Sequence, residues 1–454
     1  MECEVLICGA GIAGVSTAYH LTVRHGIKGV VLVDERPPLS LTSDKSTECY
    51  RNWWPGPDST MVDFMNRSID LLEGLALESG NIFHLNRRGY LYLTADPDQL
   101  DNFIQTAREP ARLGAGALRI HNTDPSKFEY ITSPPEGFRG MPDGADLFLD
   151  PELIRKYFPY VSNEVIAALH VRRAGWFSAQ QLGMFMLDQA RCHGTQVIEG
   201  KVTGIEIEGN RVRSTVIDDV EKIYAPIFVN AAGPFLKQIG ELQNIDLPVY
   251  SELHLKVSVR DHQGAIPRHA PLLIWTDRQT LPWSAEEISI LAEDPETRWL
   301  LDEMPAGVHT RPEGGGDSDI VLFLWEYHVN KVEPIFPPPL DEQYPEIALR
   351  GLMKMLPRLQ AYLGRSPRPY LDGGYYTKTR ENRPLIGPTQ VEGSYVIGAL
   401  SGFGLMASCA AGELLVNYIT NSELPSYAPA LSLNRYEDPN YLRLLENWED
   451  SGQL

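Results

Sequence analysis

The run Gly9-Ala10-Gly11-Ile12-Ala13-Gly14 follows directly on an apolar strand, and it constrains the fold more than any other feature. Gly9 permits a tight turn, Gly11 lets a pyrophosphate approach the backbone, and Gly14 lets the next helix pack against the strand. That helix is expected over residues 15–25, with its amino terminus facing the phosphate charge. The run therefore predicts the first turn of a dinucleotide-binding unit.

A second apolar strand, Val30-Val31-Leu32-Val33, completes the unit and ends in Asp34-Glu35-Arg36. Asp34 or Glu35 is placed to accept a hydrogen bond from an adenosine ribose 2′-hydroxyl, and a carboxylate there disfavours a 2′-phosphate. The ligand is therefore expected to be FAD or NAD rather than NADP.

Length and charge narrow the class of protein. The 454 residues suggest two or three domains. The formal net charge of −20 argues against nucleic acid or an anionic membrane surface as a partner, because both would repel the chain. Five cysteines without metal-ligand spacing indicate reduced thiols and no metal site. No apolar run reaches about 18 residues and no signal-peptide pattern opens the chain, so a cytoplasmic protein without a membrane span is expected.

Hydrophobic periodicity predicts the elements that follow the nucleotide unit. Helices are expected over residues 58–79, 98–113, 179–192, 285–303, 344–363 and 405–419. Strands are expected over residues 89–93, 196–198, 202–207, 227–234 and 394–399, and in alternation between about 247 and 327. The Pro-rich stretch 334–339 is expected to be a stiff connection.

Several motifs recur in one order along the chain. After the glycine run come a polar loop over residues 43–51, the segment at Gly175, the strand at Val202 and Asn230-Ala231-Ala232-Gly233. The chain closes with Arg383-Pro384-Leu385-Ile386-Gly387 and Ser401-Gly402-Phe403-Gly404. Together these motifs resemble the D-amino-acid oxidase-like FAD superfamily, which includes sarcosine oxidase, glycine oxidase, dimethylglycine dehydrogenase and dye-linked L-proline dehydrogenase.

The resemblance implies an α/β fold with a glutathione-reductase-type, Rossmann-like FAD domain and a second, mostly antiparallel β-sheet domain for the substrate. The FAD domain is expected to be discontinuous, over residues 1–85, 145–235 and 350–425. The substrate domain is expected over residues 86–144 and 236–349, with a carboxyl-terminal tail at 426–454. Enzymes of this kind take a hydride equivalent from the carbon beside an amine nitrogen.

The resemblance also implies which residues hold FAD. Ser43, Lys45 and Ser46 supply donors to the pyrophosphate or flavin, and the helix start at Gly404 aims a positive dipole end at the flavin pyrimidine. The full expected set is Gly9, Gly11, Ile12, Ala13, Gly14, Asp34, Glu35, Arg36, Ser43, Lys45, Ser46, Thr47, Val202, Ala231, Gly233, Gly402, Phe403, Gly404, Leu405 and Met406.

Two positions depart from the sarcosine oxidases. Where those enzymes have a cysteine that tethers FAD, this chain has Gly374, so a non-covalent FAD is expected. Where they have a lysine that binds the substrate carboxylate, it has Met406. Arg51 then becomes the first candidate for a carboxylate clamp, because a guanidinium binds carboxylate through two parallel hydrogen bonds. Arg380 is the second candidate.

Four more residues complete the expected substrate site. Tyr375 and Tyr376 are expected to act as hydroxyl donors or aromatic walls. His254 and Lys256 alternate along one strand, so both can face the flavin, and Lys256 is also a candidate for oxygen activation.

The predicted function is FAD-dependent oxidation of the C–N bond of an amino acid or secondary amine, with a small-molecule substrate and oxygen or another electron acceptor. Three alternatives stay open. A 2-hydroxy-acid oxidoreductase would use His254 as its base, an NAD-linked dehydrogenase would carry no flavin, and a non-catalytic flavoprotein would act in assembly. The sequence does not choose between a monomer and an oligomer.

Overall fold

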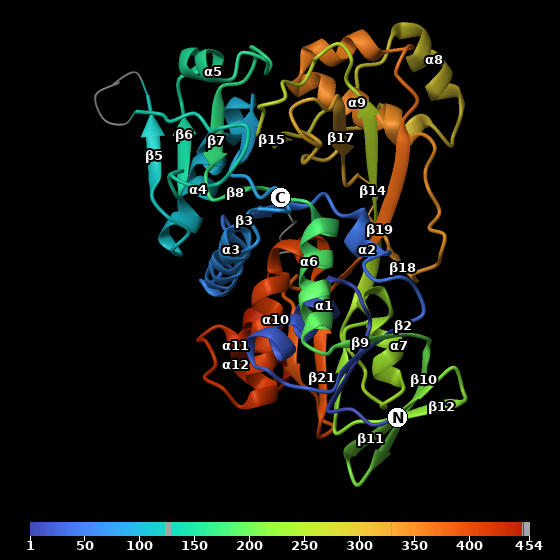
Figure 1. The fold of residues 1–454 in the computed structure, drawn as a ribbon. Helices are drawn as coiled ribbons and strands as arrows, with labels where there is room; N and C mark the ends of the chain where they lie inside the picture. Colours follow the sequence, from blue (N-terminus) through green and yellow to red (C-terminus); the bar gives the residue numbers. More distant parts are fainter. Residues whose placement is uncertain (123–128, 328, 447, 449–454) are drawn as a thin grey trace.

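A computed structural model describes residues 1–122, 129–327, 329–446 and 448. Within these residues the chain forms one six-stranded sheet, one ten-stranded sheet and two small sheets. In Figure 1 the six-stranded sheet occupies the lower half of the molecule and most of the ten-stranded sheet the upper half.

The six-stranded sheet is built from four separate stretches of sequence. Its order is β20 (Leu385–Pro388), β21 (Ser394–Gly398), β13 (Ile227–Asn230), β1 (Val5–Cys8), β2 (Val30–Asp34) and β9 (Gln196–Glu199). All neighbours run parallel except β20 and β21. Parallel strands bring their carboxyl ends to one edge, so the turns after β1, β2 and β13 lie together there.

Four helices pack around this sheet, and three of them stand side by side in Figure 1. They are α1 (Ile12–Tyr19), α3 (Thr60–Glu78), α6 (Ala179–Cys192) and α10 (Gly404–Thr420). Helix α10 contacts α1 and α3, and α1 also contacts α6. The predicted helix over 15–25 begins earlier, at Ile12 after the cap Gly11, and its last turn, His20–Arg24, is a π-helix.

Helix α10 belongs to the one segment, among the residues that the structure describes, that is long and apolar enough to cross a membrane. This segment, Ser401–Thr420, differs from the expectation that no such apolar run exists. In this fold 67% of that window is buried inside the protein. Its apolar character is accounted for by packing against α1, where the Ser16 hydroxyl donates to the Ser408 carbonyl at 2.7 Å.

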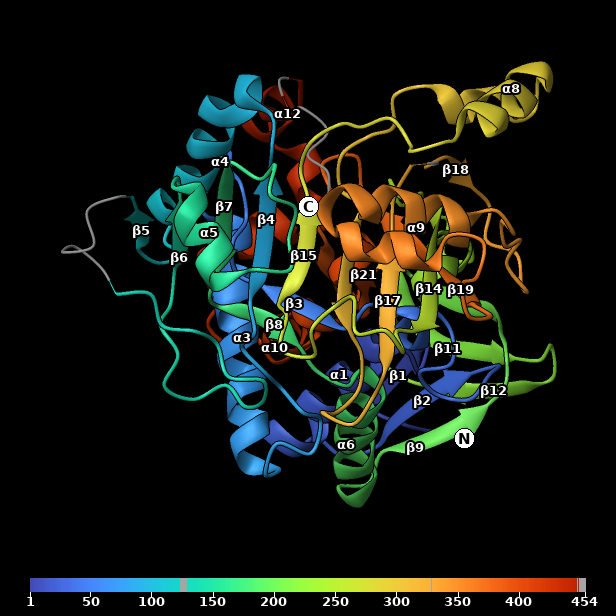
Figure 2. The same ribbon diagram turned by 90° about the horizontal axis from the view of Figure 1, so that it is seen from above.

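The ten-stranded sheet is mostly antiparallel and forms the larger layer. Its order is β18 (Lys331–Val332), β14 (Tyr250–Arg260), β17 (Ile320–Leu324), β16 (His309–Pro312), β15 (Leu272–Trp275), β4 (Tyr90–Thr94), β7 (Ala167–Val171), β6 (Ala145–Phe148) and β5 (Leu118–His121), with β19 (Tyr370–Lys378) paired to β14. Seen from above, α9 (Tyr344–Met355) covers β17 and β14 (Figure 2).

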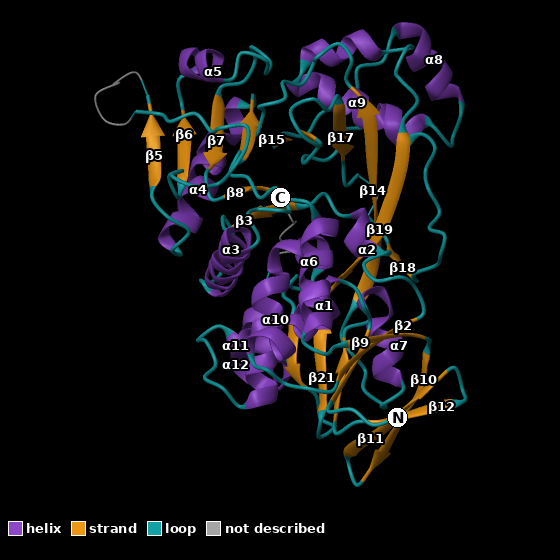
Figure 3. Ribbon diagram, in the orientation of Figure 1, coloured by secondary structure: helices purple, strands orange, loops and turns teal. Residues whose placement is uncertain are grey.

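The remaining elements connect or flank these layers, and Figure 3 shows their distribution. A short two-stranded sheet pairs β3 (Cys49–Arg51) with β8 (Ala174–Trp176), and a hairpin sheet joins β10 (Val202–Glu208), β11 (Arg211–Ile217) and β12 (Glu221–Tyr224). The other helices are α2 (Thr42–Lys45), α4 (Leu100–Arg112), α5 (Pro151–Tyr157), α7 (Leu236–Glu241), α8 (Ala285–Glu293), α11 (Ala428–Leu431) and α12 (Pro439–Glu446).

Strand pairing divides the chain differently from the predicted domains. Strands β6 and β7 belong to the segment predicted for the FAD domain, 145–235, and β19 belongs to 350–425, yet all three lie in the ten-stranded sheet. The reason is long-range pairing, since β19 runs antiparallel to β14 from more than a hundred residues away. Part of the predicted tail, residues 447 and 449–454, lies outside the described residues.

Two predicted helices are shorter than expected. The helix predicted over 285–303 ends at Glu293, two residues before Pro295, and a separate 3₁₀ turn covers Arg298–Leu301. The helix predicted over 344–363 ends at Met355, and residues Pro357–Tyr362 continue as 3₁₀ helix. Proline cannot donate the backbone hydrogen bond of a continuing α-helix, and it disfavours helical geometry in the residue before it.

Gly14 and Gly74 provide a matched pair of helical glycines. A Cβ at Gly14 would lie 1.9 Å from the Gly9 carbonyl oxygen, whereas a Cβ at Gly74 would meet nothing within 4 Å. We expect Gly14→Ala to lower the free energy of unfolding by about 1–3 kcal/mol through overpacking. We expect Gly74→Ala to raise it by roughly 0.5–1 kcal/mol through helix propensity. Urea unfolding followed by circular dichroism measures both, and a Gly14→Ala protein as stable as the unmutated one would contradict the packing argument.

Candidate functional site

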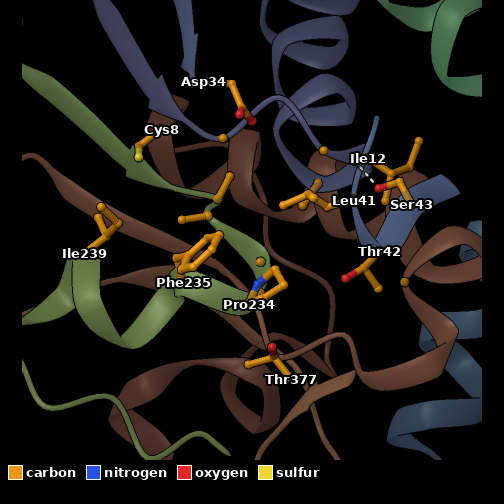
Figure 4. A pocket seen from close by; sticks show the side chains of 18 of the residues that line it. Cys8, Ile12, Asp34, Leu41, Thr42, Ser43, Pro234, Phe235, Ile239 and Thr377 are labelled. Atoms are coloured by element: carbon orange, nitrogen blue, oxygen red, sulfur yellow. Dashed lines mark hydrogen bonds between the residues drawn. The ribbon is translucent and has the colours of Figure 1, made fainter. Parts of the chain in front are cut away.

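A cavity of about 560 Å³ runs along the edge where β1, β2 and β13 end (Figure 4). Its walls come from these strand ends, from the loop over residues 35–43, from the start of β10 and from residues 397–405 before and at the start of α10. These segments are far apart in the sequence, so the parallel sheet is what brings them together.

The glycine run forms a cradle in the middle of this cavity. Gly9 has φ +110°, and a Cβ there would lie 2.4 Å from the Ala231 carbonyl oxygen at the end of β13. A Cβ at Gly11 would project to 3.5 Å from the Ser43 hydroxyl, and that hydroxyl accepts from the Ile12 N–H at 3.0 Å (Figure 4). Helix α1 begins here, so its N–H groups and positive dipole end suit a pyrophosphate.

Asp34 marks the adenosine end of the cavity. Its carboxylate accepts from the backbone N–H of Ala10 at 2.7 Å and of Arg36 at 3.0 Å. Burial raises the pKa of Asp34, and these two hydrogen bonds oppose that shift. The Arg36 guanidinium lies over the ring of Phe336 at 4.8 Å, so residues of the Pro-rich connection reach this end of the cavity.

The opposite end of the cavity lies at the start of α10. Ala399 and Ser401 both have left-handed backbone conformations, with φ of 51° and 48°, which non-glycine residues rarely adopt. Such strain persists where the surrounding structure demands it, and it is concentrated at functional sites. The residues from Gly402 to Leu405 then present the positive end of the α10 dipole.

A second, small cavity of about 50 Å³ adjoins this end, and Gly402 and Tyr376 line both cavities. We call it the substrate-side cavity. Arginine, histidine and glutamate side chains reach it from three strands and one loop: Arg51 from β3, His254 from β14, His309 from β16 and Glu326 from the segment after β17.

Arg51 is a buried cation in the wall of the substrate-side cavity. The residue is 3% exposed, its Nη1 donates to the Tyr92 hydroxyl at 3.1 Å, and its guanidinium lies 4.6 Å from the Trp54 ring centre. A charged group is costly to bury. A guanidinium in the wall of this cavity can bind an anionic group through parallel hydrogen bonds.

His254 is held between two carboxylates. Its Nδ1 lies 3.1 Å from Glu326 and its Nε2 lies 3.2 Å from Glu252, while its ring stacks on Tyr376 with centres 3.8 Å apart. Burial opposes protonation, but the charges of Glu326 and Glu252 outweigh it and raise the pKa of His254. Because both carboxylates only accept hydrogen bonds, this arrangement favours a ring that carries a proton on each nitrogen, and such a ring is a poor base.

Most of the predicted FAD residues line the main cavity. Those that do so are Gly9, Gly11, Ile12, Ala13, Asp34, Glu35, Arg36, Ser43, Ser46, Val202, Ala231, Gly233, Gly402, Gly404 and Leu405. Thr47, Phe403 and Met406 line the substrate-side cavity instead.

Gly14 and Lys45 line neither cavity. Gly14 packs against the turn at Gly9, because a Cβ at Gly14 would lie 1.9 Å from the Gly9 carbonyl oxygen. The Lys45 ammonium is paired with Asp44 at 2.7 Å and with Asp372 at 3.1 Å, so it does not point into the main cavity as predicted.

The predicted substrate residues separate into two groups. Arg51, His254 and Tyr376 meet in the substrate-side cavity. The Tyr375 hydroxyl instead bonds to the backbone of Ile335, at 2.9 Å to the carbonyl and 3.1 Å to the N–H.

Lys256 and Arg380 line neither cavity. Lys256 follows the predicted alternation but donates to the Ser46 carbonyl at 2.9 Å, and burial lowers its pKa. Arg380 is exposed in the turn after β19, so the hypothesis that it is a carboxylate clamp is not supported.

Sequence reasoning missed His309 and Glu326. Neither residue belongs to a motif, and they come from strands that only the antiparallel sheet places beside Arg51. The one available signal was the strand-like alternation of the region, which does not reveal which face is turned to the flavin.

The model of the family described as "FAD dependent oxidoreductase" matches residues 4–418. The chain belongs to this family. Human mitochondrial dimethylglycine dehydrogenase is 24% identical over 446 residues, which cover 95% of this chain but only 44% of that protein. The chain thus spans less than half the length of the curated relative it matches.

Solved structures confirm the fold. L-proline dehydrogenase from P. horikoshii superposes with a TM-score of 0.72 at 20% identity, covering 96% of this chain and 98% of that one. Glycine oxidase from Geobacillus kaustophilus has the same TM-score of 0.72 at 15% identity, covering 96% and 99%. Members of this family bind FAD, which sets aside the NAD-linked alternative. The glycine cradle, Asp34 and the start of α10 fit that cofactor.

Asp34 and Glu35 can be separated by their effect on FAD binding. Asp34 is anchored toward the cavity by two backbone hydrogen bonds, whereas Glu35 is exposed. We expect Asp34→Ala to weaken FAD binding by roughly 10- to 100-fold, because a hydrogen bond to a charged group contributes about 1.5–3 kcal/mol. Fluorescence titration of the apoprotein with FAD measures this effect, and Glu35→Ala is the control, expected to change the dissociation constant less than about threefold. A larger effect of Glu35→Ala would indicate that Glu35, and not Asp34, contacts the ribose.

Proposed function

We propose that this protein oxidises the C–N bond of a small amino acid or secondary amine, such as an N-alkyl or imino acid. The observation that carries the proposal is the buried Arg51 guanidinium in a small cavity that shares Tyr376 and Gly402 with the FAD cavity. FAD, when bound, supplies the acceptor for the hydride equivalent that leaves the substrate carbon.

Arg51 gives the substrate its orientation. A guanidinium presents two parallel donors to a carboxylate, which fixes both the position and the rotation of a bound amino acid. The α-carbon and nitrogen then lie between Arg51 and the residues shared with the FAD cavity. The small volume of about 50 Å³ favours compact substrates.

The 2-hydroxy-acid alternative has less support. The base predicted for its hydroxyl proton, His254, lies between Glu326 and Glu252, which favour its protonated form, so this alternative would need another base in the cavity. The non-catalytic alternative offers no reason for a buried cation beside the flavin end of the FAD cavity.

The mode of FAD attachment is part of the same proposal. At Gly374 a Cβ would lie 3.0 Å from the Lys45 Cβ and 3.5 Å from the Thr42 Cα, so this position packs against α2 without a side chain that can form a thioether. We propose non-covalent FAD. The cytoplasmic location and the electron acceptor stay predictions.

The test is anaerobic flavin bleaching at 450 nm with sarcosine, dimethylglycine, L-proline, glycine, D-alanine and L-lactate. Bleaching by one amine class and not by lactate supports the proposal and names the substrate group. Bleaching by lactate alone supports the hydroxy-acid alternative, and a yellow protein that none of them bleaches supports a non-catalytic role. Acid precipitation before the assay should leave the FAD in the supernatant, whereas a yellow pellet would show a covalent bond.

Replacing Arg51 tests its role as the carboxylate clamp. We expect Arg51→Met to lower kcat/KM for the best amino-acid substrate by roughly 10- to 150-fold, the range for a lost charge-assisted hydrogen bond. The same variant should change kcat/KM little for the analogue that lacks the carboxylate, such as dimethylamine for sarcosine or pyrrolidine for L-proline.

The matched control is Arg380→Met, because Arg380 is exposed and lines neither cavity. It should leave kcat/KM unchanged. Equal losses for the acid and its carboxylate-free analogue in Arg51→Met would show that Arg51 does not bind the carboxylate.

A further inference from the structure

His309 is the second histidine of the substrate-side cavity, and its hydrogen bonding is the opposite of that of His254. It is 7% exposed, at the start of β16, directly across from Leu324 of β17. Its Nδ1 lies 2.7 Å from the Gly307 carbonyl oxygen. Because a carbonyl only accepts hydrogen bonds, Nδ1 must carry the proton.

The other ring nitrogen, Nε2, is then an acceptor with an open lone pair. Among the described residues it has no hydrogen-bond partner, yet it is not among the polar atoms sealed off from any accessible space. The ring lines the substrate-side cavity, so a ligand bound there lies next to the ring that carries this acceptor.

Burial and two nearby cations disfavour protonation of His309. Burial lowers its pKa below the ordinary imidazole value of 6.5, and the cations Arg51 and His254 lower it further, against the Gly307 hydrogen bond and the Glu326 carboxylate. These are the charged groups that reach the ring from β3, β14 and the segment after β17.

The proposed reaction needs such an acceptor. An amino acid arrives with its nitrogen protonated, and only the neutral amine has the electron pair that drives hydride loss from the neighbouring carbon. Arg51 cannot accept a proton, and His254 already carries one. The Glu326 carboxylate is already paired with the His254 ring at 3.1 Å, and that charge lowers its pKa against the effect of burial.

We propose that His309 accepts the ammonium proton of the bound substrate. In this step the N–H bond of the ammonium group breaks, an N–H bond forms at Nε2, and the electron pair stays on the amine nitrogen. The step is a proton transfer and needs no oxidant, and His309 returns the proton to water after the product has left. This inference rests on the proposed amine oxidation and adds the residue that prepares the substrate for it.

Two substitutions separate this role from a structural one. His309→Asn keeps an N–H near the Nδ1 position for the Gly307 carbonyl but has no counterpart of Nε2. His309→Gln places an amide near Nε2 but cannot take up a proton. The control is His193→Asn, because exposed His193 makes the same kind of Nδ1 contact, with the Gln189 carbonyl at 2.8 Å, away from both cavities.

The measurement is anaerobic stopped-flow flavin reduction between pH 5 and 10, with the panel amine that reduces the unmutated protein fastest. At pH 7 both His309 variants should be slower by roughly 10²- to 10⁴-fold, the usual contribution of a positioned base. Their rate constants should rise tenfold per pH unit toward the substrate's own amine pKa, so the deficit shrinks at high pH. His193→Asn should follow the unmutated profile.

Three outcomes would overturn the proposal. The first is a His309→Asn or His309→Gln variant that retains the unmutated pH profile, because the ring would then serve packing or the Gly307 contact alone. The second needs no variant: the unmutated protein must lose its reduction rate as the pH falls below the ordinary imidazole pKa of 6.5, and a rate that stays constant down to the lowest pH at which the holoprotein is folded contradicts this.

The third outcome concerns the proposed function itself. If no amine reduces the unmutated flavoprotein, the amine oxidation fails and His309 has no ammonium proton to accept. If amines reduce the unmutated protein and the variants behave like it, only the role of His309 fails. Bound FAD spectra and melting temperatures of each variant confirm that the comparison is between folded holoproteins.

Discussion

The rest of the structure depends on a backbone contact between two turns. A Cβ at Gly9 would lie 2.4 Å from the Ala231 carbonyl oxygen, and a Cβ at Gly14 would lie 1.9 Å from the Gly9 carbonyl oxygen. The first contact joins the end of β1 to the end of β13, and the second joins that same turn to α1. Because side chains are excluded at both points, backbone N–H groups and a helix start line the cavity that suits FAD.

The substrate-side cavity depends on a different interaction, the long antiparallel pairing of β14 with β19. This pairing sets His254 of one strand beside Tyr376 of the other, with ring centres 3.8 Å apart. Tyr376 in turn lines both cavities. The same side chain therefore bounds the cofactor on one side and the substrate on the other, which places a bound substrate next to the flavin end of the larger cavity.

Within that cavity the pKa values of two histidines shift in opposite directions because their surroundings differ. His254 lies between two carboxylates that raise its pKa, whereas His309 donates to a carbonyl, and burial together with the cations Arg51 and His254 lowers its pKa. A cation and an acceptor can therefore coexist close to Arg51. Burial makes both effects stronger than they would be in water, because the low dielectric of the interior magnifies each neighbouring charge.

The sequence alone determined the elements whose signals are local. The glycine run, Asp34 at the end of β2 and the glycine turn before α10 each carry their chemistry within a few residues, so most of the residues predicted to hold FAD line the main cavity. The tertiary structure alone decided which polar residues reach the substrate. Arg380 and Lys45 turned out to point to solvent or to ion pairs, and His309 and Glu326 entered the cavity from strands without any motif. Strand alternation shows which side chains share a face of the strand. Only the pairing of distant strands decides which of the two faces is turned toward the cofactor.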